Sequence, residues 1–317
     1  MRQARRASRW SQAWLWAVGG FCAFFGAGVL GAWVVLVVAG CGDDGEPVHR
    51  LPIAVVSAFP AELAPIVARA QVVETVSIGH RQFRRGRIGQ TEVVLLLTGI
   101  GMANAEEAVQ SLLARFRLRG VVVSGVAGSS ERIGDVVVPS VWRLPEGGEF
   151  AVDPYWQALA TNLADTVAGA LERCTEIPDR PGAPAVCLPH RPALIVGGVG
   201  STNDPFAGQA LPCREDGGDV FGCDVEPVLS PMGWRYQGRA ASVGTRQDEP
   251  QVEDMETAVV ARAASRAGLP FIAFRAVSDG AGDPLGLPGF PAQFFVYYRL
   301  AARNAAQATV AFLQALP

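Results

Sequence analysis

Apolar runs of strand length alternate with amphipathic stretches of helical period along the chain from residue 51 onwards. Fully apolar strands are typical of a sheet that helices cover on both faces. The alternation therefore predicts one α/β domain with three α/β/α layers and a central mixed sheet. The expected strands are 53–56, 83–88, 92–98, 120–124, 135–138, 193–197 and 270–277, and the expected helices are 60–70, 103–116, 153–174, 255–267 and 292–316.

Two segments interrupt this alternation, residues 175–192 and 207–250, which are rich in proline, glycine and charge. We expect both to be surface insertions. Four cysteines lie in or next to them, and their proximity favours two local disulfides, although four cysteines allow three connectivities and free thiols are an alternative. The spacings are not the CxxC pairs of zinc sites, so no metal is expected. The favoured pairs are Cys174–Cys187 and Cys213–Cys223.

The N-terminal region has a different pattern. Four arginines in the first nine residues precede an uncharged run over residues 10–42. About 20 apolar residues cross a bilayer as a helix, and a basic flank stays in the cytoplasm. The run contains Val38-Ala39-Gly40-Cys41, which resembles a bacterial lipoprotein box with Cys41 as the lipidated residue. We expect residues 1–41 to be a signal peptide with a lipobox or, alternatively, an uncleaved membrane anchor.

Either alternative places the rest of the chain outside the cytoplasm, tethered to a membrane. Residues 42–50 are then a linker to a domain that covers residues 51–317. The formal net charge of the whole chain is −3, and loss of the four N-terminal arginines lowers it to −7. Such an acidic domain does not suit nucleic acid as a partner.

The composition also excludes several kinds of chemistry. The chain contains no lysine, which excludes Walker-type phosphate loops and Schiff-base catalysis. The Gly99-Ile100-Gly101 turn is a fragment of a dinucleotide fingerprint, but the third glycine and the following acid are missing. We therefore expect no nicotinamide cofactor.

Six short segments follow one another in an order that is typical of one family. They are 53–59 with Glu62, 98–105, 125–128 with 133–139, 204–206, 254–257 and 275–279. Together they resemble the bacterial 5′-methylthioadenosine/S-adenosylhomocysteine nucleosidases, a branch of the purine nucleoside phosphorylase superfamily. A second similarity, in residues 116–122 and 138–142, is to the plant bark and vegetative storage proteins, which are extracellular relatives. The resemblance implies a nucleoside phosphorylase-like fold, a homodimer, a purine nucleoside as ligand, and no metal or organic cofactor.

The resemblance also implies catalytic roles. Asp279 is the general acid that protonates the leaving base at N7, Glu62 activates the attacking water, and Arg275 orients the water or Glu62. Each residue also has a simpler interpretation. Asp279 fits a turn or a helix cap, Glu62 fits the favourable end of a helix dipole, and Arg275 fits a structural ion pair.

The remaining candidates bind the substrate. Glu256 accepts hydrogen bonds from both ribose hydroxyls, Met255 packs against the sugar, and Phe206 stacks on the base, with Ile100 as a further contact. The simpler interpretations are an N-capped helix start for 254–256 and an ordinary core side chain for Phe206. Val126 stands where the nucleosidases place a serine or threonine, so a hydroxyl that helps to hold the water is missing.

The expected function is hydrolysis of the N-glycosidic bond of an exported or environmental purine nucleoside, such as 5′-methylthioadenosine or S-adenosylhomocysteine. One alternative is a catalytically weak, nucleoside-binding or storage-like lipoprotein. The missing hydroxyl at Val126 and the similarity to the plant storage proteins favour this alternative. The other is a nucleoside phosphorylase. The loop 57–62 contains an acid and no base, and an acid repels phosphate, so water is the better nucleophile.

Overall fold

The structure is a computed structural model that describes residues 51–177, 182, 184–226 and 252–317. The expected signal peptide or anchor with Cys41 and the linker 42–50 lie outside the described residues. So do residues 178–181 and 183 of the first expected insertion and residues 227–250 of the second.

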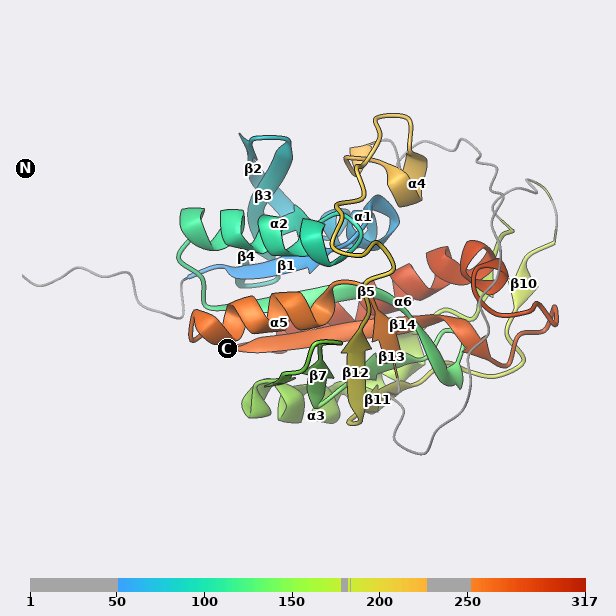
Figure 1. Cartoon of the computed structure of the whole chain (residues 1–317). Coiled ribbons are helices and arrows are strands. Elements are labelled where there is room, and N and C mark those ends of the chain that lie inside the picture. The colour runs from blue at the N-terminus through green and yellow to red at the C-terminus, as the bar shows by residue number, and fades with distance from the viewer. Residues whose placement is uncertain (1–50, 178–181, 183, 227–251) are drawn as a thin grey trace, which may run out of the picture. The chain divides into compact units, whose positions relative to one another are not determined.

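A mixed sheet forms the centre of the domain (Figure 1). β5 runs parallel to β1 on one side and to β14 on the other, β1 also pairs with β4 in parallel, and β13 joins β5 in the antiparallel sense. This confirms the predicted mixed sheet. The path through the sheet is β2 (Gln71–Ile78), β3 (Arg81–Ile88), β4 (Thr91–Leu97), β1 (Ile53–Ser57), β5 (Gly120–Arg132), β13 (Val252–Asp254), β12 (Val199–Thr202), β7 (Val141–Arg143) and β8 (Glu149–Ala151). Off this path, β14 (Phe271–Ala281) pairs with β5 and β6 (Val136–Val138), and β11 (Leu194–Val196) pairs with β6.

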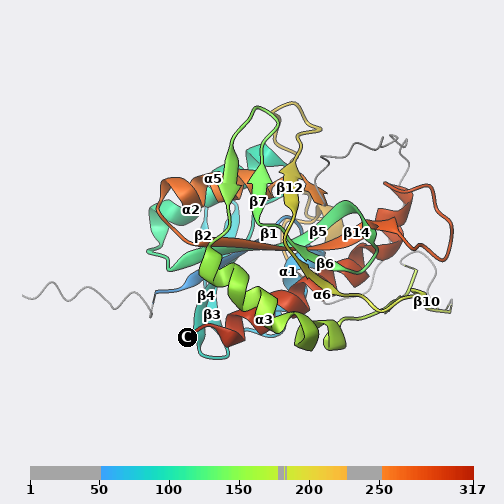
Figure 2. The same cartoon turned by 90° about the horizontal axis from the view of Figure 1, so that it is seen from below.

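Helices cover both faces of the sheet, as the apolar strands predicted (Figure 2). On β1, Ile53 and Val55 belong to the core beneath α1, α3 and α6, whereas Ala54 and Val56 belong to the core beneath α2 and α5. Successive side chains of a strand point to opposite faces, so one apolar run serves both layers. The helices are α1 (Pro60–Val67), α2 (Met102–Arg115), α3 (Pro154–Ala170), α4 (Gly218–Phe221), α5 (Thr257–Arg266) and α6 (Ala292–Ala315).

Several predicted boundaries are wrong. The helix expected over 153–174 ends at Ala170, and Cys174 begins the short strand β9 (Cys174–Thr175), which pairs with β10 (Val186–Cys187). The helix expected from residue 255 begins at Thr257. The strand β2 was not predicted, because it lies at an edge of the sheet and all its residues except the half-buried Val76 and Ile78 are exposed. Such a strand has no apolar run to reveal it.

Both disulfides that sequence proximity favoured are present, Cys174–Cys187 and Cys213–Cys223. The first joins β9 to β10, and the second closes a loop that includes α4. In the described ranges, no helix is both long enough and apolar enough to cross a membrane.

Candidate active site

The candidate residues gather along β5 and β14, next to the ends of β1 and β13. Glu62 lies in the first turn of α1, directly after β1, and Glu256 lies between β13 and α5. Arg275 on β14 is opposite Gly125 on β5. Ligands of open α/β sheets bind at the carboxyl ends of parallel strands, where the connecting loops meet. The topology therefore brings together residues that are more than 200 positions apart in the sequence.

Arg275 is the centre of a buried carboxylate cluster that we define as Glu62, Asp254, Glu256 and Arg275. Its Nη2 lies 2.7 Å from Asp254 Oδ2 and 3.2 Å from Glu256 Oε2, and its Nη1 lies 3.6 Å from Glu62 Oε1. The side chain is 1% exposed. A buried guanidinium is stable only when its donors are used, and here all three nitrogens have partners.

Two further contacts complete the bonding of Arg275. Its Nη1 donates to the Val126 carbonyl at 3.2 Å, and its Nε donates to Thr257 Oγ1 at 2.9 Å. Arg275 is thus held from β5 and from the start of α5 at once. This geometry agrees with the simpler interpretation of Arg275 as a structural ion-pair partner. It also agrees with the expectation that Arg275 lies beside Glu62.

Glu62 is held by backbone amides of the loop after β1 and of β5. Its Oε2 accepts from Ala58 N at 2.7 Å and from Phe59 N at 3.4 Å, and its Oε1 accepts from Val126 N at 2.7 Å. Burial raises the pKa of Glu62 to about 7, although Arg275 and the three amides act to lower it. At neutral pH this carboxyl is therefore close to half ionised, which suits a general base.

Gly125 makes the contact between Glu62 and Arg275 possible. A Cβ at this position would lie 2.3 Å from Arg275 Nη1 and 2.4 Å from Glu62 Oε1. Because Gly125 has no side chain, the Glu62 carboxyl and the Arg275 guanidinium can both lie close to β5.

Glu256 lies on the other side of the guanidinium. Its Oε1 accepts from Gly101 N at 2.8 Å, which ties it to the glycine turn before α2. Burial raises the pKa of Glu256 to about 8; Arg275 opposes the rise, and the carboxylates of Asp254 and Glu62 add to it. Each of its oxygens has one partner and keeps acceptor capacity for a ligand hydroxyl.

Asp279 lies four residues beyond Arg275 on β14, about 13 Å along an extended strand. It is half-buried, and Ser278 Oγ donates to its Oδ1 at 2.7 Å. Burial raises the pKa of Asp279 against this hydrogen bond, and the charge of Glu253 adds to the rise. Gly128 packs under the carboxyl, because a Cβ there would lie 2.8 Å from Asp279 Oδ2.

The structure also places the predicted substrate-binding residues. The ring of Phe206 adjoins the same glycine turn, since a Cβ on Gly101 would lie 2.8 Å from its Cδ2. Ile100 and Met255 are half-buried next to the residues that hold Glu256. Val126 contributes its backbone to the cluster and is 7% exposed. In the described part of the chain, no group of histidine, cysteine and acidic side chains has the arrangement of a metal site.

The family follows from the match to known proteins. The family model for the phosphorylase superfamily matches residues 52–314, nearly the whole described domain. The chain belongs to the phosphorylase superfamily.

Relatives of this phosphorylase-superfamily protein include nucleosidases. The 5′-methylthioadenosine/S-adenosylhomocysteine nucleosidase of Tolumonas auensis is 24% identical over 280 residues, which cover 84% of this chain and 100% of the relative. An uncharacterized Mycobacterium tuberculosis protein, Rv2293c, is 34% identical over 221 residues, which cover 61% of this chain and 87% of the relative.

Solved structures of nucleosidases share the fold. The Neisseria meningitidis 5′-methylthioadenosine/S-adenosylhomocysteine nucleosidase, in complex with methylthio-immucillin-A, has a TM-score of 0.56 at 20% identity, over 84% of this chain and 99% of that one. The futalosine hydrolase of Helicobacter pylori has a TM-score of 0.57 at 18% identity, with the same coverage of both chains. The similar structures thus include enzymes that are named for more than one substrate.

The sequence interpretation missed Asp254 as part of the superfamily protein's site. Its Oδ1 accepts from Thr202 Oγ1 at 2.6 Å and from the amides of Glu256 and Thr257 at 3.2 Å each. Its Oδ2 also accepts a hydrogen bond from the Thr257 hydroxyl. Its place two residues before Glu256 was visible in the sequence, but its contact with Arg275 depends on how β13 and β14 pack.

Proposed function

We propose that this domain hydrolyses the N-glycosidic bond of a purine nucleoside. The observation that carries the proposal is the setting of Glu62, which is buried, held by three backbone amides, and has a pKa near 7 beside Arg275. A carboxyl of this kind can take a proton from water at neutral pH. The nucleosidases among the relatives support the same chemistry.

The proposed step balances between two carboxyl groups. A water molecule adds its oxygen to C1′ of the ribose and gives a proton to the Glu62 carboxylate. The bond between C1′ and the base nitrogen breaks, and its electron pair goes to the purine. Asp279, whose pKa is raised by burial, is the proposed acid that gives a proton to the purine as it leaves.

Glu256 binds the ribose in this proposal. Its two oxygens are fixed by Gly101 N and Arg275 Nη2, and both keep room to accept a hydroxyl. Phe206, next to Gly101, is the proposed stacking partner of the base.

Val126 favours a second candidate function, binding of a nucleoside with weak turnover. The Val126 amide is already used by Glu62, and its side chain has no hydroxyl to hold the water. Phosphorolysis has less support. The single cation of the cluster, Arg275, is surrounded by Glu62, Asp254 and Glu256, whose charge opposes a phosphate ion.

One assay separates these functions. The domain is incubated with 5′-methylthioadenosine, S-adenosylhomocysteine, adenosine and inosine, with and without phosphate, and the free base is measured. We expect base release that does not depend on phosphate. Release only with phosphate would identify a phosphorylase, and binding without release from any of the four nucleosides would identify a binding protein.

We also propose that the domain works outside the cytoplasm. The basic and apolar start of the chain supports export, and two disulfides within the described residues suit an oxidising compartment. In the full chain, Cys41→Ser should move the protein from the membrane fraction to the soluble extracytoplasmic fraction if Cys41 is lipidated. A protein that stays in the membrane fraction would indicate the uncleaved anchor instead.

A further inference from the structure

Two buried threonine hydroxyls hold the Asp254 carboxylate. Thr202 Oγ1 donates to Asp254 Oδ1 at 2.6 Å, and Thr257 Oγ1 donates to Asp254 Oδ2. Both threonines are 0% exposed. The amides of Glu256 and Thr257 and the Nη2 of Arg275 are the other donors to this carboxylate. Within the described residues, each hydrogen bond of the Asp254 carboxylate is thus one that it accepts.

The second bond of each hydroxyl fixes the direction of its proton. Thr257 Oγ1 accepts from Arg275 Nε at 2.9 Å, and Thr202 Oγ1 accepts from the Ala258 amide at 2.8 Å. A hydroxyl has one proton to donate, so each threonine directs its proton to Asp254. Thr257 therefore bridges the guanidinium and the carboxylate, whereas Thr202 connects the same carboxylate to the backbone of α5.

The Thr257 bridge controls how the Arg275 guanidinium is turned. Nη1 faces Glu62 at 3.6 Å, and Nη2 faces Asp254 at 2.7 Å and Glu256 at 3.2 Å. In the described part of the chain, these three acids are the charged groups that face Arg275 from α1, from β13 and from the start of α5. The donors of a guanidinium form a rigid planar fork, so the contact at Nε sets the direction of the other two nitrogens.

Without the Thr257 hydroxyl, a different pairing is favoured. Nε of Arg275 would be a buried donor without an acceptor, which is costly. Asp254 Oδ2 would lose a donor at the same time, and it already lies 2.7 Å from Nη2. Arginine and carboxylate pair best through two parallel bonds, so Arg275 would turn to place Nε and Nη2 on Asp254. This turn would move Nη1 away from Glu62.

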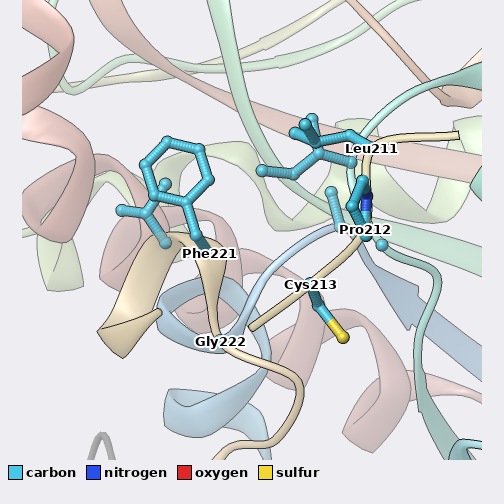
Figure 3. A pocket seen from close by; sticks show the side chains of 9 residues that line it. Leu211, Pro212, Cys213, Phe221 and Gly222 are labelled. Atoms are coloured by element: carbon cyan, nitrogen blue, oxygen red, sulfur yellow. The ribbon is translucent and has the colours of Figure 1, made fainter. Parts of the chain in front are cut away.

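Thr257 does not line the cavity beside the site. An apolar cavity of about 230 Å³, its open mouth included, lies between the loops after β1 and β4 and the segment 211–223, which the Cys213–Cys223 disulfide closes (Figure 3). Leu211 and Phe221 stand on opposite sides of it. The described residues that line it do not include Thr257, which is fully buried and uses its hydroxyl for Arg275 and Asp254. An effect of Thr257 on the reaction must therefore pass through these two residues.

We propose that Thr257 is a positioning residue whose hydroxyl holds the Arg275 guanidinium between Glu62 and Glu256. The inference rests on the proposed nucleosidase function. It adds a residue that touches neither the substrate nor the reacting atoms. It also gives Asp254 a role, because this carboxylate fixes the direction of the Thr257 hydroxyl.

The test compares Thr257→Val with Thr257→Ser. Valine keeps the shape of the side chain and removes the hydroxyl, whereas serine keeps the hydroxyl and removes the methyl group. The Arg275 charge lowers the pKa of Glu62 against burial, so a guanidinium that turns away raises this pKa. In Thr257→Val, the acid limb of the kcat/KM profile for 5′-methylthioadenosine should therefore move up by about 0.5 pH unit or more. In Thr257→Ser it should stay in place.

Thr202→Val is the matched control. It removes a buried hydroxyl from the same carboxylate but leaves the bond from Arg275 Nε to Thr257. Both valine variants should lower the free energy of unfolding, and only Thr257→Val should move the acid limb. Thr257→Ala should move the limb in the same direction and replaces Thr257→Val if that variant does not fold. An unchanged limb without the Thr257 hydroxyl, or an equal shift in Thr202→Val or Thr257→Ser, would overturn the inference and leave the proposed function intact.

The pH dependence of unfolding tests the same contact without any need for activity. If the pKa of Glu62 is higher in folded Thr257→Val, this variant binds more protons near neutral pH and should lose more stability between pH 5.5 and pH 8 than the wild type. Thr202→Val should lose as much as the wild type does. An equal loss in Thr257→Val and in the wild type would contradict the inference. No base release by the wild type would overturn the proposed function, and the unfolding measurement would still decide the role of Thr257.

Discussion

Arg275 makes its shortest ion pair with Asp254, at 2.7 Å between Nη2 and Oδ2. The contact from Arg275 to the proposed base Glu62 is longer, at 3.6 Å. Burial outweighs the attraction that Glu62 feels from the Arg275 guanidinium. This is the physical reason why the pKa of Glu62 rises to about 7 instead of falling.

Asp254→Asn should therefore shift the pH dependence of hydrolysis. Without the Asp254 charge, Arg275 acts more strongly on Glu62 and Glu256 and lowers the pKa of both. The acid limb of the kcat/KM profile should move down by about one pH unit. Glu149→Gln, which removes an exposed carboxylate that is also paired with an arginine, is the control and should leave the limb in place. A limb that stays in place in Asp254→Asn would contradict this assignment.

Glu62→Gln and Asp279→Asn should each lower kcat by about 10²- to 10⁴-fold, the usual contribution of a general base or acid. The measurement is base release from saturating 5′-methylthioadenosine, with thermal unfolding as a check on folding. In the wild type, kcat/KM should rise with pH through about 7, as Glu62 ionises. If both variants remain active, the site is misplaced.

Gly125→Ala should inactivate the domain without a change in any charged group. The added methyl would lie 2.3 Å from Arg275 Nη1, so the guanidinium and Glu62 must move apart. A displacement of about 1 Å can cost roughly 10²-fold in rate. Gly169→Ala in α3 is the control, because its methyl meets no atom within 4 Å and should stabilise the helix by about 0.5–1 kcal/mol. Equal activity of the two variants would argue against the close approach at β5.

The free energy of unfolding should fall as the pH rises from about 5 to 8. Glu62 and Glu256 have pKa values of about 7 and 8 in the folded domain but 4.5 as ordinary carboxyl groups. The folded state therefore binds more protons than the unfolded state in this range, and its advantage is lost as pH rises. For Glu62 alone the loss is on the order of 3 kcal/mol.

Urea unfolding at pH 5.5 and pH 8 measures this effect. Glu62→Gln cannot ionise, so its stability should depend less on pH than that of the wild type. Glu149→Gln, at an exposed position, should behave as the wild type does. A wild type that is more stable at pH 8 than at pH 5.5 would contradict the raised pKa values.

Much of the fold was predictable because its central strands are buried on both faces. The first eight residues of β14 are buried, and all of them except Arg275 and Ser278 are apolar. The strand prediction failed where a strand is defined by its hydrogen bonds to neighbouring strands and not by buried apolar residues. β2 is exposed, and β5 continues to Arg132 beyond the expected end at residue 124, because the glycine-rich part of β5 pairs with β14.

The site was predictable in its parts and not in its arrangement. Glu62, Glu256, Arg275 and Asp279 each lie in a segment that resembles the nucleosidases, so the sequence could name them. Asp254 was missed, because its contact with Arg275 depends on the packing of β13 beside β5. Only this packing shows that the Asp254 carboxylate lies closer to Arg275 than the Glu62 carboxylate does.

The sequence by itself predicted the α/β/α architecture, named the candidate acids and favoured the local disulfide pairs, because apolar runs, motifs and short spacings are properties of neighbouring residues. Only the tertiary structure decided the raised pKa values of Glu62 and Glu256 and the apolar cavity beside them. A pKa depends on desolvation and on charges from distant strands, and the cavity exists only where segment 211–223 packs on loops more than 100 residues before it.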